Sequence, residues 1–207
     1  GRGRVVLEVE IGVAKVPKYA VSESGDTLEL IERPNGGLSV VLVDGQSSGS
    51  SARVISNIVA RKAITLLGEG VRDGAAARAA HDYLCTHRRR QVSAELQIVS
   101  VDLSTGTLVI SRNTHCPAYV AAGGSCRVLD APSNPIGLYP NTKPVIEEIP
   151  IAAGTYAIVA TDGVQEAGSR RGRALDLAAV ATELTAGDAP GQQVADGILA
   201  RALALDE

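Results

Sequence analysis

Apolar positions along this chain recur with two different spacings, which separate strands from helices. Short aliphatic runs rich in Val and Ile predict buried strands. After the first three runs, apolar residues recur at the spacing of a helix, at Ala52, Ile55, Val59, Ala63 and Leu66. We predict strands near 5–13, 17–31, 38–43, 94–102, 107–113, 117–121, 145–150 and 155–161, and helices near 50–67, 73–88, 174–186 and 190–205. Strands grouped apart from paired helices indicate an α+β fold built in layers.

Two of the aliphatic runs end in the same dipeptide, Asp-Gly. The first is LSVVLVDG, ending in Asp44 and Gly45, and the second is TYAIVATDG, ending in Asp162 and Gly163. Asp-Gly is also a strong signal for a tight hairpin turn. However, a helical pattern follows the first pair, and a segment rich in charge and glycine follows the second. We therefore predict that two strands end in carboxylates that meet as a metal site.

A third acid, Asp26, precedes the first of these strands. The sequence Pro-Asn-Gly-Gly at 34–37 predicts a turn that folds the strand of Asp26 back beside the strand of Asp44. On its own, Asp26 is more typical of a surface strand residue than of a metal ligand. Three clustered carboxylates would repel one another without a cation, whereas hard divalent ions such as Mg²⁺ and Mn²⁺ prefer oxygen ligands.

Several motifs together resemble the metal-dependent Ser/Thr protein phosphatases of the type 2C class, in particular the bacterial SpoIIE-like branch. They occur in the family's order: SGDT around Asp26, VVLVDGQSSGSSA around Asp44, SVDLSTGTLVISRNTHCPAYV from Ser100, NPIGLY from Asn134 and IVATDGVQEA around Asp162. The resemblance implies one domain over residues 1–207, with a four-layer α-β-β-α sandwich of two antiparallel sheets flanked by helical hairpins. It also implies hydrolysis of phosphoserine or phosphothreonine on a protein by a metal-activated water.

The same resemblance assigns roles to site residues. In the family, the acid that matches Asp44 bridges two Mg²⁺ or Mn²⁺ ions, and the carbonyl of the residue matching Gly45 is a further ligand. The acid matching Asp162 completes the second metal site, and the acid matching Asp26 lies at the same centre, often through metal-bound water. We therefore expect Asp26, Asp44 and Asp162 to be catalytic and, with Gly45, to hold the metal.

The chain departs from the family pattern at two places. Ser47 replaces the middle glycine of the usual Asp-Gly-x-Gly-x-Gly loop. The family also has a further acid that opens a strand after the last helix, and this sequence has Leu205-Asp206-Glu207 there. The expectation is that the domain is truncated at its C-terminal strand or that the last ligand is missing, and Asp206 is not assigned that role.

Charge and cysteine content narrow the function classes. The formal charge of −3 gives no electrostatic reason to bind nucleic acid. Cys85, Cys116 and Cys126 are odd in number and lack metal-site spacing, which predicts reduced thiols in a cytoplasmic protein. No segment has the ~20 apolar residues that a membrane span needs.

Further residues and one rival function stay open at this stage. His115 follows a strand and is a candidate general acid, although a loop histidine is more often structural. Arg170, Arg171 and Arg173 are candidates for docking a phosphoprotein. The family implies a phosphorylated protein substrate such as an anti-sigma-factor antagonist. The alternative is a weak or inert phosphoprotein-binding regulatory module of the same fold.

Overall fold

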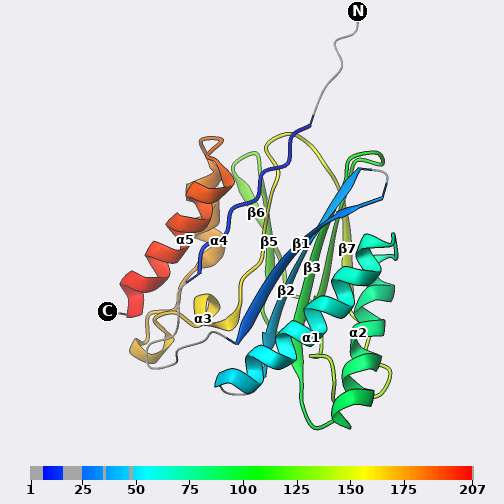
Figure 1. The fold of residues 1–207 in the computed structure, drawn as a ribbon. Coiled ribbons are helices and arrows are strands. Elements are labelled where there is room, and N and C mark those ends of the chain that lie inside the picture. The colour runs from blue at the N-terminus through cyan, green and yellow to red at the C-terminus, as the bar shows by residue number, and fades with distance from the viewer. Residues whose placement is uncertain (1–6, 16–24, 35, 47–48, 207) are drawn as a thin grey trace, which may run out of the picture. The chain divides into compact units, whose positions relative to one another are not determined.

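The computed structural model describes residues 7–15, 25–34, 36–46 and 49–206. The chain divides into two compact units (Figure 1). The larger unit comprises Pro17–His115 and Asp130–Ile151. The smaller unit comprises Gly1–Val16, Cys116–Leu129 and Ala152–Glu207.

The larger unit is an antiparallel sheet with two helices on one face. Its strand order is β1-β2-β3-β4-β7, and each neighbouring pair is antiparallel. Helices α1 and α2 lie side by side against this sheet (Figure 1). The elements are β1 (Asp26–Arg33), β2 (Gly37–Gly45), α1 (Gly49–Gly68), α2 (Asp73–Arg88), β3 (Ala94–Asp102), β4 (Thr107–Asn113) and β7 (Val145–Pro150).

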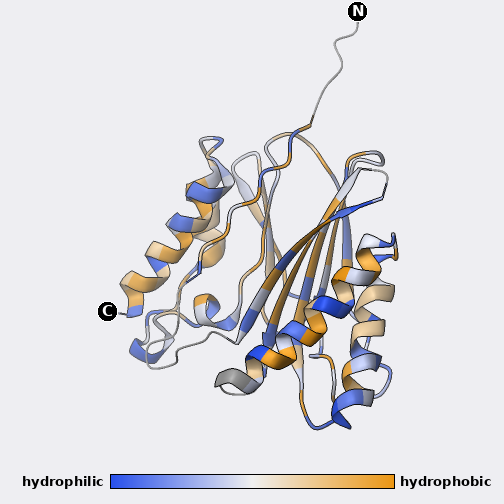
Figure 2. Cartoon of the chain, in the orientation of Figure 1, coloured by the Kyte–Doolittle hydropathy of each residue, from blue (hydrophilic) through white to orange (hydrophobic). Residues whose placement is uncertain are grey.

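Alternation along the strands decides which side chains meet the helices. On β2, Val41 and Val43 are fully buried and pack in one cluster with Ile55 and Val59 of α1. The residues between them along β2 face the other side of the sheet, because successive side chains of a strand alternate. The apolar stretches of these strands are visible in Figure 2. The core is aliphatic, as expected for a chain without Phe, Trp or Met.

Polar contacts reinforce the helix-facing side of the sheet. The Thr27 hydroxyl donates to the side-chain oxygen of Asn57 over 2.7 Å, which ties β1 to α1. Near the other end of the sheet, the hydroxyls of Ser39 and Ser100 are hydrogen-bonded at 2.6 Å, and Ser100 donates to the Asp73 carboxylate. Asp73 begins α2, so these bonds fix the start of α2 on the sheet.

The smaller unit repeats the plan with a shorter sheet. Its strand order is β6-β5-β8, and α4 packs on this sheet and against α5 (Figure 1). Leu177, Val180, Val194 and Ile198 of the two helices form a core with Tyr119. The elements are β5 (Ala118–Ala122), β6 (Ser125–Leu129), β8 (Tyr156–Ile158), α3 (Asp162–Gln165), the 3-10 turn η1 (Ser169–Arg171), α4 (Leu177–Thr185) and α5 (Gly191–Asp206).

The α+β class, the two antiparallel sheets and the paired helices on each sheet are confirmed. The predicted strand near 5–13 is wrong over its described part, because residues 7–15 form no strand. There the backbone N–H and C=O of Val13 instead bond the Gln192 side-chain amide, at 3.0 and 2.7 Å. The last predicted strand, 155–161, is shorter in the structure, since β8 ends at Ile158. Residues 17–24 of the second predicted strand lie outside the described residues.

Candidate functional site

Asp26 and Asp44 lie directly opposite each other on neighbouring strands. The antiparallel register of β1 and β2 pairs Asp26 with Asp44 and continues to the pairing of Arg33 with Gly37. The predicted turn at 34–37 therefore brings the two acids together, although Asn35 itself lies outside the described residues. Cβ atoms of directly paired residues are ~4.5–5.5 Å apart, and their side chains share a face.

This face is the one opposite α1 and α2. Thr27 bonds Asn57 on the helix side, and Val43 packs on α1, so their neighbours Asp26 and Asp44 project to the other side. Both acids are half-buried. Along the same face of β2 the next residues are Leu42 and Val40, so the carboxylates occupy a polar end of an otherwise aliphatic surface.

A third acid, Glu95, continues this row onto β3. The register of β2 and β3 pairs Asp44 with Glu95, so Asp26, Asp44 and Glu95 occupy adjacent positions across three strands. Glu95 was not among the site residues predicted from the sequence. The sequence does show an acid in a buried strand, between Ala94 and Leu96. The strand order is needed to see that Glu95 lies beside Asp44.

The Glu95 carboxylate is hydrogen-bonded through both of its oxygens. Oε2 accepts from the Thr114 hydroxyl over 2.6 Å, and Oε1 bonds Nδ1 of His115. Only 7% of Glu95 is exposed, whereas 56% of the His115 side chain is exposed. The row of acids therefore ends in a buried carboxylate that holds an accessible imidazole.

The NPIGLY segment fixes the beginning of β3, where Glu95 lies. The backbones of Ala94 and Ile136 exchange two hydrogen bonds, of 3.0 and 2.9 Å. The following residue, Gly137, donates its N–H to Nδ1 of His81 over 2.9 Å. Burial lowers the pKa of His81, which keeps that nitrogen available as an acceptor.

Gly45 is required by the close approach of α1. A Cβ atom at Gly45 would lie only 2.2 Å from the carbonyl oxygen of Ala52, and one at Gly25 would lie 2.9 Å from the Ala52 Cβ. The ends of β1 and β2 are therefore pressed against the first turns of α1. Ser47 lies outside the described residues.

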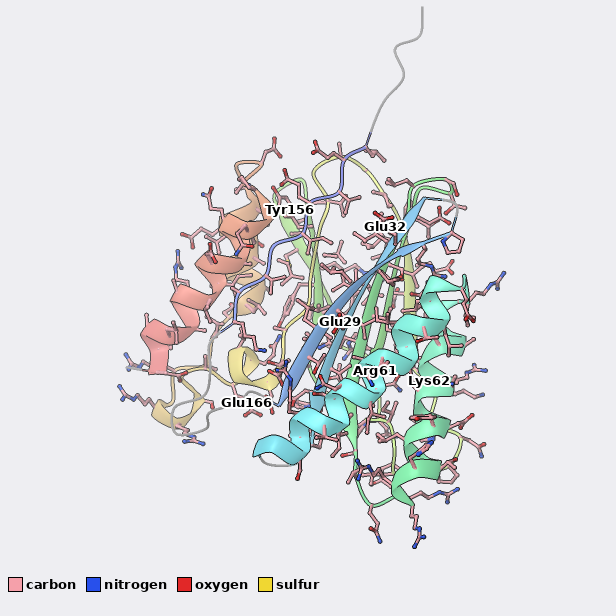
Figure 3. All side chains as sticks on the ribbon, in the orientation of Figure 1. Glu29, Glu32, Arg61, Lys62, Tyr156 and Glu166 are labelled. Carbon is pink, nitrogen blue, oxygen red and sulfur yellow. The ribbon has the colours of Figure 1, made fainter. Side chains whose placement is uncertain are left out.

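Asp162 lies in the smaller unit, at the first position of α3. The strand before it ends at Ile158, and Asp162 is half-buried. Its backbone oxygen accepts from the N–H of Glu166 over 2.8 Å, which closes the short helix. Glu166 itself is exposed (Figure 3).

The donor set of Asp26 and Asp44 suits a hard divalent cation. Like charges placed directly opposite in a sheet are destabilising, and a cation between two carboxylates removes that cost. Arg53 of α1 donates from Nη1 to the backbone oxygen of Asp26 over 2.9 Å, so one protein cation also lies at this end of β1.

Within the part of the chain that the structure describes, no helix is both long and apolar enough to cross a membrane.

Comparisons with known proteins agree with this architecture. The PP2C phosphatase domain of SpoIIE from Bacillus subtilis, solved with a fragment of its regulatory domain, has a TM-score of 0.79 at 19% identity. The RsbU and RsbW domains of a Mycobacterium tuberculosis protein give 0.74 at 17% identity. These matches cover 94% and 92% of this chain, and the chain spans 57% of each of those structures.

A further solved structure, the serine/threonine phosphatase PstP/Ppp of Mycobacterium tuberculosis, has a TM-score of 0.68 at 12% identity, over 95% of this chain and 90% of that one. The comparison with curated proteins gives no match. The family model of stage II sporulation protein E (SpoIIE) matches residues 34–207. The chain therefore belongs to the SpoIIE family and has the fold of type 2C phosphatase domains.

Proposed function

We propose that this chain is a protein phosphatase that hydrolyses phosphoserine or phosphothreonine on a protein substrate, with its two units acting as one catalytic domain. The observation that carries the proposal is the direct pairing of Asp26 with Asp44 on adjacent strands of a SpoIIE-family sheet. Both carboxylates lie on the face of the sheet opposite α1, where paired oxygen ligands suit a divalent cation.

The proposed metal ligands are Asp26, Asp44, the carbonyl of Gly45 and Asp162, with Mg²⁺ or Mn²⁺ as the ions. When bound, two divalent cations would supply stabilisation of charge on the phosphoryl oxygens and a lowered pKa for a water molecule held there. The protein's part is positioning. The strand register holds Asp26 opposite Asp44, and the contact with Ala52 fixes the backbone at Gly45. Asp162 enters the ligand set through the resemblance alone.

The proposed substrate is a phosphorylated regulatory protein of the anti-sigma-factor antagonist kind. The support is the similarity in fold to SpoIIE and to a structure containing RsbU and RsbW domains. Exposed Arg170, Arg171 and Arg173 in the smaller unit offer guanidinium groups that suit phosphate oxygens.

The test is phosphate release from a phosphoserine protein with and without Mn²⁺, using the wild-type chain and Asp44→Asn. We expect metal-dependent release by the wild type and loss of most of it in the variant, because the amide retains the size of the side chain and removes its charge. Glu29→Gln is the matched control, since Glu29 is an exposed acid on β1 (Figure 3). Metal binding without any turnover would instead support the phosphoprotein-binding module.

A further inference from the structure

The Glu95 and His115 pair lies beside the proposed centre and has the arrangement of an acid–base dyad. We propose that His115, oriented by Glu95, donates the proton that the leaving seryl or threonyl oxygen needs, a role that rests on the proposed phosphatase function. The residues that carry this inference all lie in the larger unit.

The bond to Glu95 sets the orientation of the His115 imidazole. An ionised carboxylate only accepts hydrogen bonds, so the bond between Glu95 and His115 places the hydrogen on Nδ1. Thr114 occupies the other carboxylate oxygen and limits rotation of Glu95. With Nδ1 committed to Glu95, Nε2 points away from that carboxylate, on a ring that is more than half exposed.

The Glu95 and His115 pair is joined to the strand next to that of Asp44. Glu95 is the direct cross-strand partner of Asp44, and paired side chains project from the same face of the sheet. Thr114 and His115 follow the last residue of β4, Asn113, which pairs with Leu96 next to Glu95. The imidazole is therefore anchored one strand away from Asp44, on the side where the proposed substrate phosphate would lie.

The proposed reaction transfers one proton from His115 to the leaving seryl oxygen. Water adds to phosphorus and gives up one of its protons to solvent, the bond from phosphorus to the seryl oxygen breaks, and its electron pair goes to that oxygen. A proton from Nε2 of His115 converts the oxygen to the serine hydroxyl, and the imidazole regains a proton from solvent. The products are the free hydroxyl and inorganic phosphate. Both ring nitrogens of a protonated imidazole are donors, so Nδ1 keeps its bond to Glu95 while Nε2 supplies the proton.

A purely structural role for His115 is the competing explanation, because a buried carboxylate such as Glu95 needs hydrogen-bond donors. The two roles differ in their dependence on the leaving group. An alkoxide leaves poorly without a proton, whereas nitrophenolate is stable as an anion and leaves without one. A general acid therefore matters for a phosphoserine peptide and not for p-nitrophenyl phosphate.

The experiment compares both substrates, with Mn²⁺ present, in the wild type, His115→Gln, Glu95→Gln and the control His87→Gln. His87 is an exposed histidine near the end of α2. We expect His115→Gln to lose ~10²–10⁴-fold in kcat on the phosphoserine peptide and to retain turnover of p-nitrophenyl phosphate. Glu95→Gln should lose about tenfold on the peptide alone, since the ring remains but is less well oriented. His87→Gln should match the wild type on both.

A second readout is independent of turnover. The Nδ1 proton of His115 should give a downfield imidazole NMR resonance in the metal-free protein, and this resonance should be lost in both His115→Gln and Glu95→Gln. Equal losses on both substrates in His115→Gln, or unchanged peptide turnover, would overturn the dyad while leaving the phosphatase intact. Absence of wild-type turnover on either substrate would instead overturn the proposed function and the dyad with it.

Discussion

The two Asp-Gly pairs of this protein look alike in sequence and differ in structure. Asp44 and Gly45 are the last two residues of a nine-residue strand that has partners on both sides. Asp162 and Gly163 instead begin a four-residue helix, after a three-residue strand whose one strand partner among the described residues is β5. The first pair is held by a ladder of backbone hydrogen bonds, and the second by the turns of a loop.

The two glycines also serve different purposes. Gly45 has no room for a side chain, because a Cβ atom there would lie 2.2 Å from the Ala52 carbonyl oxygen. A Cβ atom at Gly163 would meet nothing within 4 Å. The same dipeptide is thus a steric requirement at one site and not at the other, so the motif alone does not identify its structural role.

The prediction with the largest expected effect tests whether Asp44 and Asp162 bind the same metal centre. We predict that Asp44→Asn lowers kcat/KM for phosphoprotein hydrolysis about a thousandfold and that Asp162→Asn lowers it about a hundredfold, since each removes a charged ligand. The double variant should be within about threefold of Asp44→Asn alone, because residues that act as a unit are strongly non-additive. Phosphate release at saturating Mn²⁺ measures all three, with Glu29→Gln as control.

A double variant whose loss equals the product of the two single losses would separate the acids. The two Asp-Gly pairs would then contribute independently, and Asp162 would leave the proposed ligand set.

The next effect in size concerns the free energy of unfolding, which an alanine should lower at Gly45 and should not lower at Gly163. Gly45→Ala should destabilise the protein by ~2–3 kcal/mol, because Cβ would overlap backbone atoms of α1. Gly163→Ala should be neutral or stabilising by ~0.5 kcal/mol, since alanine suits a helix and has open space there. Thermal unfolding measures both, at ~2–4 °C per kcal/mol for a chain of this size. Equal shifts would show that the close packing at Gly45 is relieved by small movements.

Much of the fold follows from local pattern, and the site follows only in part. Helix 73–88 and strands 94–102, 107–113 and 145–150 agree with the predicted ranges, because their apolar periods are uninterrupted. Strand β6 was missed, although Gly123 and Gly124, both with positive φ, form the turn that pairs it with β5. Helix α4 begins later than predicted, because Asp176 caps it by accepting from the N–H of Ala179.

For the site, the sequence predicts Asp26 and Asp44 on neighbouring antiparallel strands, because a turn lies between them, and the structure adds their direct pairing. It did not give Glu95, because β3 is separated from β2 by two helices and its register depends on tertiary packing. His115 was selected as a lone histidine. Its orienting carboxylate lies 20 positions earlier in the sequence, so the dyad is visible only in the structure.

The smallest expected effect concerns Asp206. Its side chain supports the turn that follows Asp162 and Gly163, whereas Asp44 and Gly45 are held by strand pairing. The Asp206 carboxylate accepts from the N–H of Gly168 over 2.9 Å, in the turn that follows α3. Asp206→Ala should cost ~1 kcal/mol, or about 2–4 °C in Tm, because a buried N–H loses its acceptor. Asp206→Asn should cost less, since an amide oxygen can still accept. Both variants should keep metal-dependent turnover, because Asp206 supports the turn after α3 and is not among the proposed metal ligands. Asp188→Asn removes the same charge from an exposed residue and serves as the control.

A loss of turnover in Asp206→Asn as large as that of Asp44→Asn would make Asp206 a metal ligand. The loop after Asp162 and Gly163 would then be tied to α5 through the bound cation.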